Sequence, residues 1–65
     1  MDKAKISENL RRLRGTKSLA SVAGEVGVTP SALSNYEAGI RVPRDEVKKA
    51  LADYYGETVD AIFFS

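Results

Sequence analysis

The sequence of 65 residues contains no cysteine, no histidine and no tryptophan. Without cysteine the chain can form neither a disulfide nor a thiolate metal site. Without histidine it lacks the commonest metal ligand and the commonest general base. No glycine-rich phosphate loop follows a strand, and no acidic cluster has the spacing of metal ligands. We therefore expect no catalytic residues, no metal, no cofactor and no small-molecule ligand.

The sequence also lacks a long hydrophobic run. No apolar segment approaches the roughly 20 residues that cross a bilayer. The two lysines near the N-terminus are not followed by the apolar stretch of a signal peptide. We expect no membrane partner and a cytoplasmic location. Hydrophobic residues make up 43% of the chain and charged residues 29%, which is typical of a folded domain. We expect a single domain over residues 1–65.

Charge is distributed unevenly along the chain, although the net charge is only +1. Residues 1–44 hold eight Lys or Arg and four Asp or Glu, giving +4, and residues 45–65 hold two and five, giving −3. This asymmetry predicts one face suited to phosphate and another suited to a different partner. A chain this small buries only about 60% of the surface that its unfolded form exposes, so we expect a partner chain to contribute to its stability.

Apolar residues recur at helical spacing, and no segment alternates long enough at period two to form a strand. We expect an all-α fold of five helices. The first carries Ile6, Leu10 and Leu13 on one face and ends at Gly15. The others are expected from Ser18 to Gly27, from Thr29 to Gly39, from Pro43 to Gly56, and from Thr58 to Phe63.

The segment of residues 20–40, ASVAGEVGVTPSALSNYEAGI, is the most informative part of the chain. It is typical of two short helices joined by a tight turn at Gly27, with the second helix opened by Thr29 and Pro30. Two helices in this layout form a helix-turn-helix, here over residues 18–38 approximately, in which the second helix enters the major groove of DNA.

Four segments together resemble the Cro/repressor-type (XRE-like) helix-turn-helix family of phage and bacterial transcription regulators. They are IxxNLRRLR at 6–14, SLASVAGEVGVT at 18–29, SALSNYEAG at 31–39, and RVPRDEVKKALADYYGETVDAIF at 41–63. The resemblance implies a compact, lambda-repressor-like bundle of five helices. It also implies that the third helix, residues 30–38, reads base edges in double-stranded DNA.

Carried over by this resemblance, the base-reading positions are Pro30, Ser31, Ala32 and Asn35. The Asn35 carboxamide is the best suited of them, because it can bond N6 and N7 of one adenine together. Ser31 can donate or accept but discriminates poorly, Ala32 offers a methyl group to thymine, and Pro30 offers van der Waals contact.

The resemblance also implies an ion pair between Arg14 and Glu37 that ties the first helix to the reading helix. The expected phosphate contacts are Arg14, Lys17, Ser18, Ser34, Tyr36, Arg41 and Arg44. One departure from the family is Leu19, which stands where a glutamine commonly contacts phosphate. The short link from Gly15 to Lys17 is another departure.

The acidic end of the chain carries aromatic residues that so small a bundle cannot easily bury together. We expect an exposed apolar surface there, formed by Val59, Ile62, Phe63 and Phe64 and used in a homodimer. A two-fold dimer would read a near-palindromic operator, and a chain without a sensory domain is better suited to a repressor than an activator.

An alternative stays open on the sequence. The same fold can serve as a protein-interaction module, such as an antitoxin or an adaptor, with weak or no DNA binding. Leu19 and the small reading surface are compatible with that alternative. A DNA reader should gather Arg14, Lys17, Arg41 and Arg44 around Ser31 and Asn35, and an adaptor need not.

Overall fold

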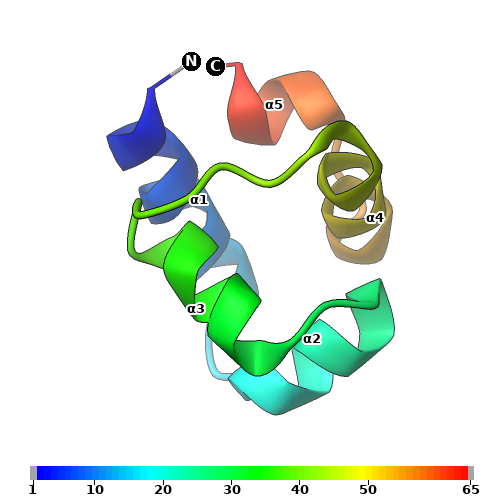
Figure 1. The fold of residues 1–65 in the computed structure, drawn as a ribbon. Coiled ribbons are helices and arrows are strands. Elements are labelled where there is room, and N and C mark those ends of the chain that lie inside the picture. The colour runs from blue at the N-terminus through cyan, green and yellow to red at the C-terminus, as the bar shows by residue number, and fades with distance from the viewer. Residues whose placement is uncertain (1, 65) are drawn as a thin grey trace.

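The computed structural model describes residues 2–64 and consists of five helices in this range, with no strand (Figure 1). The helices are α1 (Lys3–Arg14), α2 (Leu19–Val26), α3 (Pro30–Glu37), α4 (Asp45–Tyr55) and α5 (Val59–Phe63). The all-α prediction and the order of the five helices are confirmed. In the described part of the chain, no helix has both the length and the apolar character needed to cross a bilayer.

Short polar side chains begin the helices where the sequence predicts them. The hydroxyls of Ser18, Thr29 and Thr58 each accept a hydrogen bond of 3.0 Å from the backbone N–H three residues later. Each bond satisfies one of the N–H groups that have no partner within the helix. The three caps therefore fix the starts of α2, α3 and α5 from local sequence alone.

The predicted start of α4 at Pro43 is wrong by two residues. Arg44 has an extended backbone (φ −71°, ψ 167°), so the helix begins only at Asp45. Proline fixes φ near a value that both helical and extended chains adopt, so Pro43 was compatible with either. The linker between α3 and α4 is thus extended through Arg44, which has consequences for the surface described below.

The core lies where the five helices meet. Helix α1 packs on α3 and α5, α2 packs on α3 and α4, and α4 packs on α5. The buried apolar side chains come from all five helices, and they are Ile6, Leu10, Val22, Ala23, Leu33, Tyr36, Leu51, Ala52, Ile62 and Phe63. Each large side chain of this kind contributes about 1.5–3 kcal/mol on burial, which stabilises α3 against the rest of the bundle.

Two glycines allow the chain to turn around α3. Gly27 has φ +80° and ends α2, so the chain reverses within three residues before Pro30 begins α3. Gly39 has φ +74° just after α3, and a Cβ there would lie 3.6 Å from the carbonyl oxygen of Lys3. A side chain at either position would force a conformation that L-residues rarely adopt.

Candidate nucleic-acid interface

Helix α3 presents a polar stripe outward and an apolar face inward. Leu33 is fully buried and Tyr36 is 8% exposed, so both residues face inward. Ser31 is exposed and Asn35 is half-buried, one turn apart on the same side of the helix. Ala32 is half-buried beside this stripe, and Pro30 is exposed at the start of α3. The residues expected to read bases therefore lie on one helix, three of them in its first turn and Asn35 one turn after Ser31.

Helix α1 holds the C-terminal end of α3 through the backbone of Glu37. The Ser7 hydroxyl donates a hydrogen bond to the Glu37 carbonyl oxygen, and Nη1 of Arg11 donates to the same oxygen at 2.6 Å. Nη1 of Arg11 also donates to the Ser7 hydroxyl. The last carbonyls of a helix have no partner within it, so these bonds satisfy one of them and fix where α3 ends.

The expected ion pair between Arg14 and Glu37 is present in the structure. Nε of Arg14 lies 2.7 Å from Oε2 and 3.0 Å from Oε1 of Glu37. Nη1 of Arg14 donates to the Lys17 carbonyl oxygen at 2.7 Å, so one guanidinium joins α1, the α1–α2 link and α3. The hydrogen bond to Glu37 raises the pKa of Arg14 above its ordinary value, although burial acts in the opposite direction. The Glu37 side chain is 6% exposed, so little of its half of the ion pair is in contact with water.

Ser7 and Arg11 were not singled out by the sequence reasoning. They stand one residue after Ile6 and Leu10, and with Arg14 they form a polar row beside the apolar one. Residues at i, i+4 and i+7 lie on one face of a helix. The spacing could therefore have indicated a second interacting face on α1, but not that its partner is Glu37.

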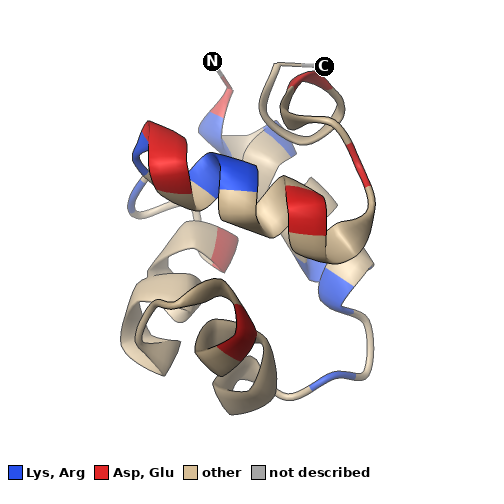
Figure 2. Ribbon diagram, turned by 90° about the vertical axis from the view of Figure 1, so that its right-hand side faces the viewer, with Lys and Arg blue, Asp and Glu red and all other residues tan. Residues whose placement is uncertain are grey.

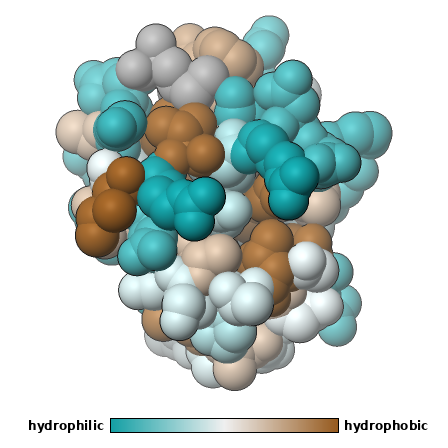
Figure 3. Space-filling model, viewed as in Figure 1, coloured by the Kyte–Doolittle hydropathy of each residue, from teal (hydrophilic) through white to brown (hydrophobic). Residues whose placement is uncertain are grey.

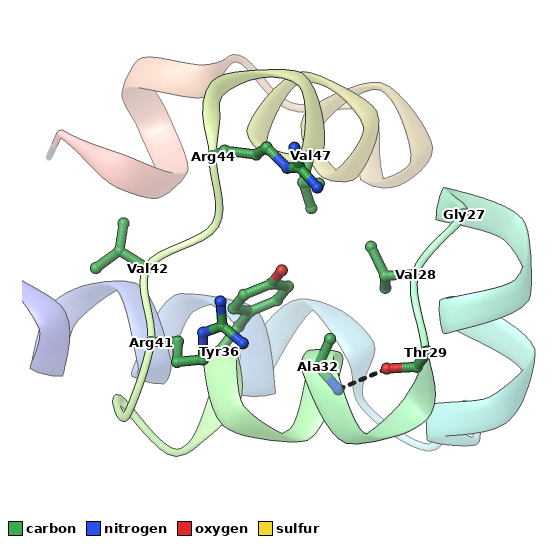
Figure 4. Close-up of a pocket in the computed structure, with 9 residues that line it drawn as sticks. All are labelled: Gly27, Val28, Thr29, Ala32, Tyr36, Arg41, Val42, Arg44 and Val47. Atoms are coloured by element: carbon green, nitrogen blue, oxygen red, sulfur yellow. Dashed lines mark hydrogen bonds between the residues drawn. The ribbon is translucent and has the colours of Figure 1, made fainter.

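A groove of about 480 Å³ opens along the other side of α3, between α3 and α4 (Figure 4). Its lining comes from the α2–α3 turn, from α3, from the extended linker and from the first turn of α4. The lining residues are Gly27, Val28, Thr29, Ala32, Tyr36, Arg41, Val42, Arg44 and Val47. Arg44 lies 3.3 Å from Glu46, but both side chains are at least 75% exposed, so this ion pair is weak.

The cationic residues expected at phosphates thus fall into two groups around α3. Arg14 and Lys17 are joined to each other and reach α3 through Glu37. Arg41 and Arg44 line the groove next to Tyr36. On a helix with about 100° per residue, Tyr36 and Glu37 point in different directions, on either side of the buried face. Lys17, Ser18 and Ser34 are exposed, as a surface contact requires.

The acidic half of the sequence does not form a uniformly acidic face. Figure 2 shows basic positions along α4 between acidic ones. Lys49 pairs with Asp53 at 3.1 Å, and Lys48 lies 3.6 Å from Asp45. The acidic residues of α4 are therefore partly neutralised within the helix. The difference in net charge between the two parts of the sequence is larger than the difference between the corresponding surfaces.

The expected dimer surface requires a correction. Ile62 and Phe63 are each only 2% exposed and belong to the core of the protomer. Helix α5 has only five residues, and Ile62 and Phe63 are the side chains that it buries against the rest of the bundle. Val59 packs partly against the same core, and only Phe64, 56% exposed, keeps a largely free ring. Lys48 covers part of that ring, with Nζ 5.3 Å from its centroid.

Apolar side chains on the face that carries the groove are scattered rather than continuous. Figure 3 shows hydrophobic residues separated by hydrophilic ones across this view. Among residues 2–64 the most exposed large apolar residue is Ile40, 66% exposed, in the linker after α3. Isolated apolar residues on a surface are ordinary and do not by themselves indicate a protein interface.

Tyr55 carries a buried polar atom close to the ion pair. Its hydroxyl has no hydrogen-bond partner among residues 2–64. Burial and the negative charge of Glu37 raise the pKa of Tyr55 to about 12 from 10.0. The folded protein therefore retains this proton between pH 10 and 12, whereas the unfolded chain loses it.

We expect Tyr55→Phe to raise the free energy of unfolding at neutral pH by about 0.5–1 kcal/mol, because it removes a buried unpaired hydroxyl. In the original protein the free energy of unfolding should fall as the pH rises from 10 to 12, and the variant should show a shallower fall. Urea unfolding followed by circular dichroism measures both. An equal pH slope in the two proteins would contradict the assigned cause of the raised pKa.

The arrangement of α2, the turn at Gly27 and the outward stripe of α3 defines the helix-turn-helix class of protein. Comparison with family models matches residues 6–62 to the family described as a helix-turn-helix domain. The chain belongs to that family, and the resemblance drawn from the sequence is confirmed.

One solved structure supports the same assignment. The solution structure of the SOS-response transcriptional repressor LexA from Eubacterium rectale is similar to this chain, with a TM-score of 0.86 and 32% sequence identity. The similarity covers 92% of this chain and 66% of that one, so this chain spans just under two thirds of that structure. No curated protein matches the chain significantly.

Proposed function

We propose that this chain is a sequence-specific, double-stranded DNA-binding transcriptional regulator that acts as a repressor. The observation that carries the proposal is the outward stripe of α3, with Ser31 and Asn35, on a helix whose end is fixed by α1 through Glu37. A reading helix must be held in one orientation for its side chains to meet base edges. The similar solved structure is that of a transcriptional repressor, which supports the regulatory role.

Base reading is assigned to Pro30, Ser31, Ala32 and Asn35, with Asn35 making the most discriminating contact. The surface is small, so phosphate contacts and DNA shape supply the remaining affinity. The phosphate contacts are assigned to Arg14, Lys17, Ser18, Ser34, Tyr36, Arg41 and Arg44. Leu19 is half-buried and packs against the core, so its side chain is turned away from DNA. The groups left at the start of α2 to contact a phosphate are the backbone N–H groups and the Ser18 side chain.

We further propose that the protein binds as a homodimer to a near-palindromic operator. A single small stripe reads few base pairs, and two-fold symmetry doubles the contacts on half-sites about one helical turn apart. With Ile62 and Phe63 in the core, Val59 and Phe64 are what remains of the expected surface for this dimer.

Two lysine variants, each of which removes one positive charge, test the DNA-binding surface. We expect Lys17→Gln to lower affinity for duplex DNA several-fold and to reduce the slope of log K against log salt by about 1 for each protomer bound. Lys49→Gln is the matched control, because Lys49 lies on α4 and pairs with Asp53. Fluorescence anisotropy over a salt series measures both. Equal losses of DNA affinity in the two variants would show that only net charge matters. If neither the original protein nor the variants bind duplex DNA, the interaction module is favoured.

A further inference from the structure

Tyr55, at the end of α4, has a hydroxyl without a role in the contacts described so far. The hydroxyl oxygen is buried and has no hydrogen-bond partner among residues 2–64. Burial raises the pKa of this hydroxyl, the charge of Glu37 raises it further and the charge of Arg14 lowers it, so the hydroxyl lies close to the ion pair. A buried hydroxyl without a partner is unfavourable. Tyr55 is therefore an available donor beside a buried carboxylate.

The Glu37 carboxylate can accept a further hydrogen bond. Both of its oxygens accept from a single donor, Nε of Arg14, whereas a carboxylate has about four acceptor positions. The backbone of Glu37 is held separately, because Ser7 and Arg11 donate to its carbonyl oxygen. The side chain of Glu37 can therefore change its partner while the end of α3 stays in place.

DNA binding places a second demand on Arg14. Its side chain is 23% exposed, and its Nη2 has no hydrogen bond to any of residues 2–64. In the proposed function this guanidinium contacts a phosphate, which competes with Glu37 for it. A carboxylate that is 6% exposed and loses its partner is strongly unfavourable. Phosphate contact by Arg14 is therefore costly unless another donor reaches Glu37.

We propose that Tyr55 is this second donor. When a DNA phosphate draws the Arg14 guanidinium away from Glu37, the Tyr55 hydroxyl donates to the Glu37 carboxylate in its place. The inference rests on the proposed function. It adds that Tyr55 is a positioning residue, which acts through Glu37 rather than on DNA and keeps the reading helix in place while Arg14 holds the phosphate. The exchange needs only movement of side chains, because the Glu37 carbonyl oxygen keeps its own donors.

The exchange of partners can be tested without DNA in Arg14→Met, where Glu37 has lost its arginine. We expect Tyr55→Phe to raise the melting temperature of the original protein but to lower that of Arg14→Met, by about 4–8 °C. The sign reverses because the hydroxyl is unpaired in the first protein and bonded to Glu37 in the second. Circular dichroism measures the melting temperatures. A rise in both proteins would show that the hydroxyl does not reach Glu37 and would overturn the proposal.

DNA binding tests the same exchange in proteins that keep Arg14, and so does not depend on whether Arg14→Met folds. The probe is a mixed-sequence duplex of about 20 base pairs at low salt, because a phosphate contact does not depend on sequence. We expect Tyr55→Phe to bind this duplex about fivefold less tightly per protomer, although it is at least as stable as the original protein. Tyr54→Phe is the matched control, since it removes a hydroxyl from the adjacent residue, and it should change the affinity less than twofold.

A second background shows whether the hydroxyl acts through Glu37. The double variant Arg14→Met with Glu37→Gln has neither the guanidinium nor the carboxylate, so Tyr55→Phe should leave its DNA affinity unchanged. Equal affinity of Tyr55→Phe and the original protein, or an equal loss in both backgrounds, would overturn the proposal while the proposed function stands. If the original protein binds no duplex even at low salt, the proposed function fails, and this inference fails with it whatever the melting temperatures show.

Discussion

Arg14→Met is expected to lower the free energy of unfolding by about 2–3 kcal/mol, because it leaves the Glu37 carboxylate buried without its partner. The Glu37 side chain is 6% exposed, and both of its oxygens accept from Nε of Arg14. Because the Arg14 side chain is 23% exposed, we expect a smaller loss of stability than for a fully buried ion pair. Proteins of this size are stable by about 3–10 kcal/mol, so the variant loses a large fraction of its stability. Urea unfolding followed by circular dichroism measures the change.

Two further variants separate the lost pair from a general loss of charge. The double variant Arg14→Met with Glu37→Gln has no buried charge left unpaired, so we expect it to recover much of the loss. Arg12→Met removes an exposed arginine from the same helix and should change the free energy of unfolding by less than about 0.5 kcal/mol. If Arg12→Met and Arg14→Met destabilise equally, the pair does not fix α3 as described.

Asn35→Ala is expected to remove discrimination at one base pair of each half-site, by about 1–3 kcal/mol per contact. Asn35 is half-buried on the outward stripe of α3, and alanine keeps the helix while removing the carboxamide. In a dimer the loss counts twice on the preferred operator. Binding to an unrelated duplex should change little, because that binding depends on phosphate contacts.

Selection of binding sites from a random DNA pool, with the original protein and with Asn35→Ala, measures the loss directly. The variant should recover a motif that has become degenerate at one position per half-site. Lys17→Gln provides the contrast, since loss of a phosphate contact should weaken binding to all sequences and leave the motif unchanged. An unchanged motif with Asn35→Ala would remove Asn35 from the base-reading set.

The parts of the fold that were predictable from sequence depend on local chemistry. Ser18 and Thr29 cap their helices through bonds that span three residues, and Gly27 turns the chain because it adopts φ +80°. Pro43 shows the limit of local reasoning, because its φ fits a helix start and an extended linker equally well. The structure decides between them through Arg44, which stays extended.

Features that depend on docking between helices were not predictable. Phe63 and Phe64 are adjacent and chemically identical, and the packing of α5 against the core decides that the first is buried and the second exposed. The groove joins Val28, Tyr36 and Val47, which lie far apart in the sequence. The Arg14–Glu37 pair came from a family resemblance, whereas the bonds from Ser7 and Arg11 to the same residue required the structure.

The central claim is that this chain reads a specific DNA sequence as a dimer. Selection of sites from a random duplex pool with the original protein, at two salt concentrations, tests it most directly. The account predicts a single motif with two-fold symmetry, half-sites about one helical turn apart, and affinity that falls steeply with salt. Recovery of no motif from the pool would contradict the claim and would leave the protein-interaction module as the function to pursue.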